Sequence, residues 1–173
     1  MSRKRGEHTS AAPHRGGSVD DLITRAHHAA VCVQDFVAAR DFYVDVLGFR
    51  VEGEMDRRDE PALGTVVGLP GAVVRWAVLA RDSFRLELFK YYAPAGRTEA
   101  NRQCDAGYTH VAFEVRDVDE AYRRLTVAGH RTTAPPQILR GGRTKVIYLL
   151  APEDSVVELI EFRDPVTSSG VSS

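Results

Sequence analysis

The first half of the chain carries apolar residues in the patterns of a strand, a helix and three further strands. From His28 the sequence reads HAAVCVQD, an apolar run that predicts a strand. Asp35 then stands where an N-cap residue accepts hydrogen bonds from the first turn of a helix. Residues 39–47 repeat apolar side chains at three- and four-residue spacing, which predicts a helix that ends at Gly48. The strands predicted after it cover residues 49–54, 72–79 and 84–89.

The second half repeats this order of elements. From His110 the sequence reads HVAFEVRD, with Val and Asp at the same distances from the histidine as in the first half. Asp117 is the matching N-cap, and residues 118–128 predict a helix that ends at Gly129. The strands predicted after it cover residues 131–133, 144–150 and 156–161. An internal repeat of this kind indicates two related modules rather than one irregular domain.

The repeat sets the expected boundaries of the folded chain. We expect one domain over residues 22–164, with modules at about residues 24–95 and 106–163. Residues 1–21 and 165–173 are polar and without periodicity, so we interpret them as disordered tails. A long connection with several Pro and Gly residues, 55–71, is of the kind that often carries function.

Composition excludes several classes of protein. The 173 residues include 23 Lys and Arg against 24 Asp and Glu, a net charge of −1, so we expect no nucleic acid or membrane among the partners. No apolar run approaches the ~20 residues of a membrane helix, and the amino terminus has no secretory signal pattern. The two cysteines, Cys32 and Cys104, form no disulfide framework. These features predict a soluble, cytoplasmic protein.

Four ionisable residues occupy equivalent places in the two halves. A histidine opens the first strand of each half, at His28 and His110, and a glutamate lies between aliphatic neighbours in each last strand, at Glu87 and Glu158. Two modules related by an approximate twofold axis would bring these side chains together. Two imidazoles and two carboxylates suit a divalent first-row metal such as Zn, Ni, Co, Mn or Fe.

Strand alternation supports this interpretation, although each residue has an ordinary structural alternative. His28 and Cys32 should share one face of their strand, with Val31 on the opposite, helix-covered face. A single histidine in such a place is more often a hydrogen-bonded structural residue, and a single strand glutamate is more often just exposed. Their common register in two copies favours the metal site. His27 is expected to point to the other face.

These motifs resemble the vicinal oxygen chelate superfamily, which includes glyoxalase I, methylmalonyl-CoA epimerase, extradiol dioxygenases and bleomycin resistance proteins. The resemblance implies an α+β fold of two βαβββ modules that form an open, cup-shaped barrel around one divalent metal ion. It also implies a small-molecule substrate and a homodimer, in which some members build the metal site from both chains. The segments that carry the resemblance are His28–Asp35 (HAAVCVQD), FY at 42–43, VLGF at 46–49, LEL at 86–88, HVAFEVRD at 110–117 and VELIE at 157–161.

The resemblance also narrows the chemistry. A full set of His28, Glu87, His110 and Glu158 favours a metal-dependent isomerase or lyase that moves a proton next to a carbonyl group, with Glu158 as the general base. Two alternatives stay open: an Fe(II) extradiol-type dioxygenase that leaves Glu87 off the metal, and a non-catalytic protein that binds a drug or metabolite. The first module lacks an acid over residues 71–80, where epimerases carry a second base. Five side chains on or beside the predicted strands are candidates to line the cup, namely Arg75, Trp76, Arg85, Tyr91 and Tyr148.

Overall fold

The computed structural model of the chain describes residues 19–99 and 101–163. The tail predicted for residues 1–21 lies outside the described residues as far as residue 18, and the tail predicted for 165–173 lies wholly outside them. Among the described residues no helix has the length and apolar character needed to cross a membrane.

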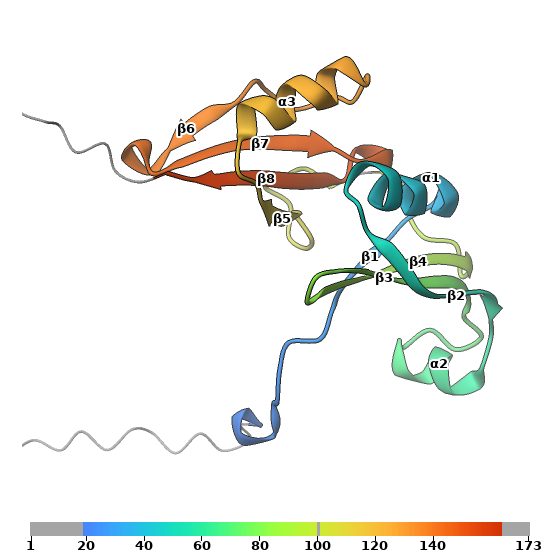
Figure 1. Cartoon of the computed structure of the whole chain (residues 1–173). Coiled ribbons are helices and arrows are strands. Elements are labelled where there is room, and N and C mark those ends of the chain that lie inside the picture. The colour runs from blue at the N-terminus through green and yellow to red at the C-terminus, as the bar shows by residue number, and fades with distance from the viewer. Residues whose placement is uncertain (1–18, 100, 164–173) are drawn as a thin grey trace, which may run out of the picture.

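The first module is a mixed four-stranded sheet with its first helix on one face (Figure 1). The strand order is β1-β4-β3-β2, with β1 parallel to β4 and the other neighbours antiparallel. The helix α1 continues as a π-helical turn over Phe42–Val46. The elements of this module are β1 (Ala29–Cys32), α1 (Phe36–Asp41), β2 (Arg50–Arg58), α2 (Pro61–Val66), β3 (Val73–Arg81) and β4 (Phe84–Ala93).

The second module has the same topology. Its strand order is β5-β8-β7-β6, and the first strand is again parallel to the last. The helix α3 lies over the sheet as α1 does in the first module (Figure 1). The elements are β5 (His110–Glu114), α3 (Val118–Val127), β6 (Gln137–Leu139), β7 (Thr144–Leu150) and β8 (Val156–Phe162). The predicted α+β fold of two βαβββ modules is therefore confirmed.

The predicted helix boundaries are also confirmed at both modules. The Asp35 carboxylate accepts a hydrogen bond from the backbone N–H of Ala38 at 3.1 Å, and Asp117 accepts one from Glu120 at 2.9 Å. Each satisfies a backbone donor that the first helical turn leaves without a partner. Gly48 and Gly129 follow the helices with φ of +71° and +86°, a conformation that glycine adopts without a steric cost.

Two predicted segments differ from the structure. The strand expected at residues 131–133 is only a single bridge between Thr132 and Leu149, and the edge strand β6 forms instead at Gln137–Leu139. The intervening Pro135 and Pro136 have no N–H to donate, so ladder pairing resumes only after them. The connection expected over residues 55–71 is shorter, because β2 runs on to Arg58 and α2 follows.

One hydrophobic core joins the two modules. Leu86 and Leu88 of β4 are fully buried, as is Val157 of β8, and all three belong to the same cluster. The Phe113 ring of the second module lies edge-on to two rings of the first, with centroid distances of 5.6 Å to Phe49 and 5.8 Å to Phe84. Edge-to-face contacts of this kind are favourable beyond the area that they bury. The helix-covered faces of both sheets thus point into shared protein interior, and their other faces stay open.

A glutamate of the second module holds the start of α1. The Glu153 carboxylate accepts hydrogen bonds from the backbone N–H groups of Gln34 at 2.8 Å and Asp35 at 2.6 Å. Glu153 itself has a φ of +62°, in the left-handed region that a non-glycine residue seldom adopts. The turn thus keeps an unfavourable backbone conformation that aims the carboxylate at the other module. This contact is the polar counterpart of the apolar contact between the modules.

We expect Glu153→Gln to lower the free energy of unfolding by about 1 kcal/mol, because a charged acceptor is replaced by a neutral one at a partly solvated site. Urea unfolding followed by circular dichroism measures the change. Asp82→Asn is the matched control, since Asp82 also has a positive φ of 51° but its side chain is 90% exposed. Equal midpoints for the two variants would show that the Glu153 contact contributes nothing.

Candidate functional site

The first candidate pair is formed by His28 and Glu87. His28 lies directly before β1, and Ala30 of that strand pairs in parallel with Glu87 of β4. Because Leu86 and Leu88 point into the core, alternation turns Glu87 to the open face of the sheet. The Nε2 atom of His28 is 3.4 Å from Oε2 of Glu87. The parallel contact between β1 and β4 thus brings together two residues that are distant in sequence.

The second pair, His110 and Glu158, repeats this geometry. Ala112 of β5 pairs with Glu158 of β8 in the register that joins Ala30 to Glu87 in the first module. Val157 is buried on the core side, so Glu158 also faces outward. The Nε2 atom of His110 is 3.2 Å from Oε2 of Glu158. Both glutamate side chains are largely covered, at 16% and 15% exposure, while both histidines are more open.

Within one chain the four residues form two separate pairs. No group of three or more His, Cys, Asp or Glu side chains suited to a metal ion is found over residues 19–99 and 101–163. Each pair lies on the sheet face opposite the shared core. The assignment of His28, Glu87, His110 and Glu158 as metal ligands therefore stays a prediction, and a single ion bound by all four needs the two open faces to meet.

Two further residues determine how His110 is presented. The hydroxyl of Thr109 lies 3.2 Å from Nδ1 of His110, on the opposite side of the ring from the nitrogen nearest Glu158. The Tyr148 ring lies 5.2 Å from the His110 ring, tilted by 40°. Burial, and then the negative charge of Glu158, raise the pKa of Tyr148, so its hydroxyl stays neutral over a wide pH range. The candidate Tyr148 thus does lie at the site, whereas Thr109 gave no signal in the sequence.

His27 differs from its expected position. We expected it to point away from His28, but the two Nδ1 atoms are 2.9 Å apart and the rings meet edge-to-face at 5.2 Å between centroids. The reason is that β1 begins only at Ala29, so strand alternation does not govern the two histidines before it. The neighbours of the two candidate pairs therefore differ: His27 beside His28, and Thr109 with Tyr148 beside His110.

The two candidate arginines are engaged elsewhere. Arg75 binds Glu54 at 2.6 Å, and its guanidinium carbon lies 4.5 Å from the centre of the Phe36 ring of α1, on the helix side of the sheet. Arg85 binds Glu52 at 2.6 Å. Both positive charges are offset by carboxylates from β2, so neither is available as a free anchor for an anionic group.

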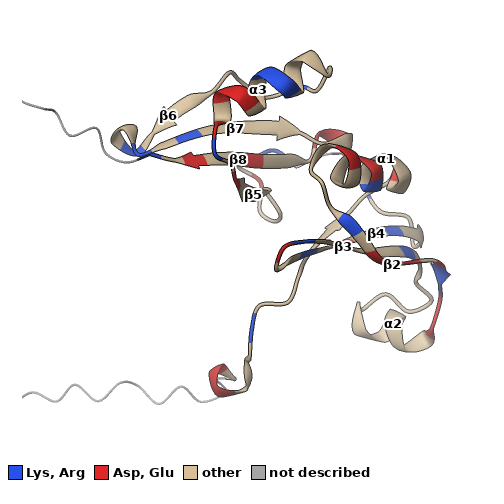
Figure 2. Cartoon of the chain, viewed as in Figure 1, with Lys and Arg blue, Asp and Glu red and all other residues tan. Residues whose placement is uncertain are grey.

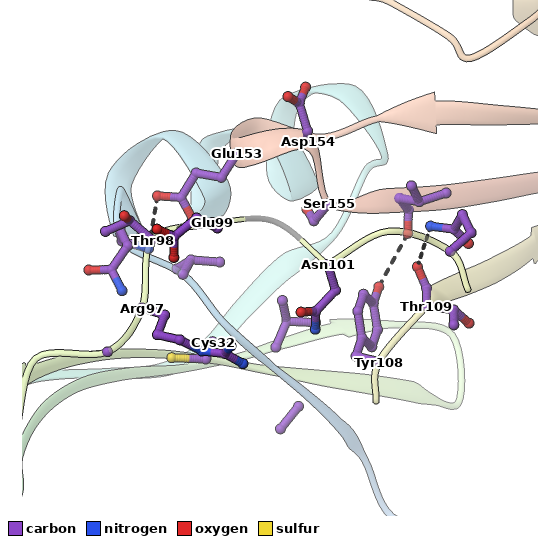
Figure 3. A pocket seen from close by; sticks show the side chains of 17 residues that line it. Cys32, Arg97, Thr98, Glu99, Asn101, Tyr108, Thr109, Glu153, Asp154 and Ser155 are labelled. Carbon is purple, nitrogen blue, oxygen red and sulfur yellow. Dashed lines mark hydrogen bonds between the residues drawn. The ribbon is translucent and has the colours of Figure 1, made fainter. Parts of the chain in front are cut away.

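A cavity of about 370 Å³ lies between β1 and the turn that carries Glu153 (Figure 3). The connection between the modules closes it on one side, where Tyr108 donates a hydrogen bond to the carbonyl of Val156 at 3.2 Å. Cys32 and Thr109 also line it. The cavity therefore adjoins β1, the strand that follows His28, and Thr109, whose hydroxyl contacts His110. None of the four predicted ligands is among the lining residues.

Cys32 has an altered acidity in this setting. The thiol is exposed to the cavity, yet desolvation by the surrounding protein raises its pKa, with a smaller contribution in the same direction from the Glu153 carboxylate. A hydrogen bond with the backbone of Tyr91 opposes the rise but does not cancel it. A higher pKa lowers the fraction of reactive thiolate near neutral pH.

Comparison with known proteins places this geometry in a family context. The family model described as the Glyoxalase/Bleomycin resistance protein/Dioxygenase superfamily matches residues 25–166, which include both modules. The crystal structure of a glyoxalase family protein from Bacillus cereus has a TM-score of 0.72 at 22% identity, covering 85% of this chain and 99% of that one. At that identity the likeness concerns the fold.

Two curated relatives bear names of epimerases. The chain is 27% identical over 133 residues to an ethylmalonyl-CoA/methylmalonyl-CoA epimerase of Cereibacter sphaeroides, covering 77% of this chain and 92% of the relative. It is 30% identical over 141 residues to a 2-epi-5-epi-valiolone epimerase of an Actinomyces species, covering 78% and 77%. The similarity thus extends over both modules in each case.

We expect the Cys32 thiol to be alkylated by iodoacetamide more slowly in the folded chain than in urea at pH 7.5, because its raised pKa leaves less thiolate. The variant Cys104→Ser isolates this thiol, and Cys32→Ser provides the comparison at the other exposed cysteine. The rate should rise with pH along a curve displaced upward in the folded state. Superimposed folded and unfolded curves would rule out the shift.

Proposed function

Because the chain belongs to the glyoxalase/bleomycin resistance protein/dioxygenase superfamily, we propose that it is a divalent-metal-dependent isomerase or lyase that moves a proton next to the carbonyl group of a small molecule. The observation that carries this proposal is the His–Glu pair built in the same register in both modules, at 3.4 Å and 3.2 Å. The relatives named as epimerases support an isomerase in particular.

The donor chemistry fits a metal ion. Imidazole nitrogen and carboxylate oxygen are ligands that Zn, Ni, Co, Mn and Fe accept, and both kinds of donor face the same open side in each module. One pair supplies only two donors, fewer than the three protein ligands of a usual catalytic zinc site. A complete site would thus combine His28 and Glu87 of one copy with His110 and Glu158 of a second copy.

A homodimer follows from this proposal. Within one chain the helix-covered faces of both sheets point into the shared core. The two His–Glu pairs therefore lie on the opposite, open faces of their sheets. A second copy related by a twofold axis would place the open face of its second module against the open face of this copy's first module. The same axis would place this copy's second module against the first module of the second copy. Such a dimer contains two equivalent sites.

Proton transfer is assigned to Glu158. When bound, a divalent ion polarises the substrate carbonyl and offsets the negative charge that develops on proton removal. The Glu158 carboxylate takes the proton from the carbon next to the carbonyl, and the resulting carboxylic acid returns it to the same carbon or to the adjacent one. Thr109 keeps His110 oriented through Nδ1, and the Tyr148 ring packs beside the same imidazole.

The equivalence of the two pairs weighs against the dioxygenase alternative. A dioxygenase site of His28, His110 and Glu158 would leave Glu87 without a role, although Glu87 is placed and covered just as Glu158 is. The non-catalytic binding alternative leaves both pairs without a role. The isomerase or lyase proposal uses all four residues.

We expect the purified chain to bind about one divalent ion per copy as a dimer, and Glu87→Gln to lose metal affinity because a neutral amide is a poorer ligand. Titration with Zn, Ni, Co, Mn and Fe salts, followed by elemental analysis, measures binding, and light scattering measures mass. Asp45→Asn in the π-helical turn Phe42–Val46 is the matched control, since this carboxylate is exposed and belongs to neither pair. A chain that binds none of these ions overturns the proposal, and stoichiometric binding by a monomer overturns the shared site.

We expect Glu158→Gln to lower catalysis by at least about 100-fold, because general-base assistance of this kind is typically worth 10²–10⁴-fold. Deuterium incorporation from D₂O next to the carbonyl, followed by NMR on a panel of 2-oxoaldehyde hemithioacetals and 2-substituted malonyl thioesters, reports proton transfer directly. The loss should exceed that explained by metal occupancy measured on the same sample. Unchanged exchange in Glu158→Gln would assign the base elsewhere.

A further inference from the structure

A segment with two exposed large aliphatic side chains precedes the first strand of the first module. Residues 19–27 are here called the N-terminal arm. Its end next to β1 lines a pocket together with the turn between β3 and β4, and its other end, with a short 3₁₀ turn at Asp20–Leu22, leads away from the sheets (Figure 1). Leu22 is 71% exposed and Ile23 is 65% exposed. Every arm residue is exposed to solvent. Two adjacent large aliphatic side chains held clear of the protein are a feature of a segment that packs on something else.

A second exposed apolar surface lies at the far end of the second module. Leu139 of β6 and Phe162 of β8 are 49% and 58% exposed, and both are register neighbours of Thr144 on β7, so they share one sheet face. Glu158 lies on that face, because Phe162 is four residues further along the same strand.

Positive charge surrounds these two side chains. Arg140, Arg143 and Arg163 are all exposed there, and Figure 2 shows the blue residues at this end of the sheet. Arg140 and Arg143 make no ion pair within the described part of the chain, and Arg163 has only a contact of 3.7 Å with Glu161. Leu139, Arg140, Arg143, Phe162 and Arg163 are here called the hairpin-end patch.

The arm and the patch are complementary in character. The arm carries Asp20 and Asp21 immediately before Leu22 and Ile23, and the patch places arginines beside two exposed apolar side chains. Within one chain the arm and the patch lie well apart (Figure 1). We propose that the arm of each copy docks on the hairpin-end patch of a second copy, with Leu22 and Ile23 on Leu139 and Phe162 and with Asp21 facing Arg143. This inference rests on the proposed site shared between two copies.

The lengths of the two segments agree with this arrangement. Ile23 is five residues before His28, so an extended arm spans about 17 Å between them at roughly 3.3 Å per residue. On the second copy, Phe162 is four residues after Glu158, which gives about 13 Å along a strand. If His28 lies beside the second copy's Glu158 in a shared site, the arm reaches the patch with little slack. The arm then fixes the approach of His28 to that site.

Dimer stability tests the apolar part of this contact. The double variant Leu22→Ser with Ile23→Ser should raise the dimer dissociation constant at least about 100-fold, because each of the two arms loses burial worth roughly a factor of ten or more. Analytical ultracentrifugation of the full chain over a concentration series measures it. The control is Val127→Ser, at the end of α3, where the side chain is 79% exposed and belongs to neither surface.

Charge exchange tests the polar part. Asp21→Arg and Arg143→Glu should each raise the dissociation constant, because each sets like charges against each other. The combined variant Asp21→Arg with Arg143→Glu should dimerise more tightly than either single variant. Failure of the combined variant to recover would exclude this pairing, since the two residues would then act independently.

The outcomes separate this inference from the proposed function. A wild-type dimer that binds metal, with arm variants as tight as Val127→Ser, overturns the arm contact and leaves the shared site intact. Weakened arm variants in a dimer that binds no metal support the arm contact and overturn the proposed function. A wild-type chain that is monomeric at micromolar concentration overturns both.

Discussion

The parallel contact between the first and last strand of each module is the constraint on which the rest depends. It sets Ala30 opposite Glu87 and Ala112 opposite Glu158, and so brings each glutamate to the histidine that precedes or opens the first strand. The apolar neighbours of each glutamate fix which face of the sheet the carboxylate lies on. Because Leu86, Leu88 and Val157 must be buried, a shift of one residue would turn either carboxylate into the core, at a large desolvation cost.

Both modules contain this parallel contact, but the neighbours of the resulting His–Glu pair differ between them. His110 has a hydroxyl beside one ring nitrogen and a tilted tyrosine ring next to it, while His28 has a second histidine as its neighbour. A symmetric scaffold with asymmetric neighbours suits a site in which one glutamate mainly holds an ion and the other also transfers a proton. The difference gives a physical reason to assign the base to the second module.

The contact between the modules explains why the two pairs stay apart in one chain. Phe113 packs against both Phe49 and Phe84, and Glu153 holds the amino end of α1, so the helix-covered sides are joined. The open sides carry the two His–Glu pairs. The N-terminal arm directly precedes His28 in the chain, so the docking proposed for the arm would affect the geometry of the candidate site through the same few residues.

Local patterns in the sequence determined the repeat, the strand and helix order, the caps at Asp35 and Asp117 and the outward direction of the two glutamates, because each depends only on spacing and on burial of neighbouring side chains. They failed at β6, where two prolines delay the ladder, and at His27, where no strand has begun. Only the tertiary structure decided that the four candidate residues form two pairs and that Thr109 and Tyr148 contact His110. Those features follow from how two sheets pack through a shared core, and packing joins residues whose separation in the chain carries no periodic signal.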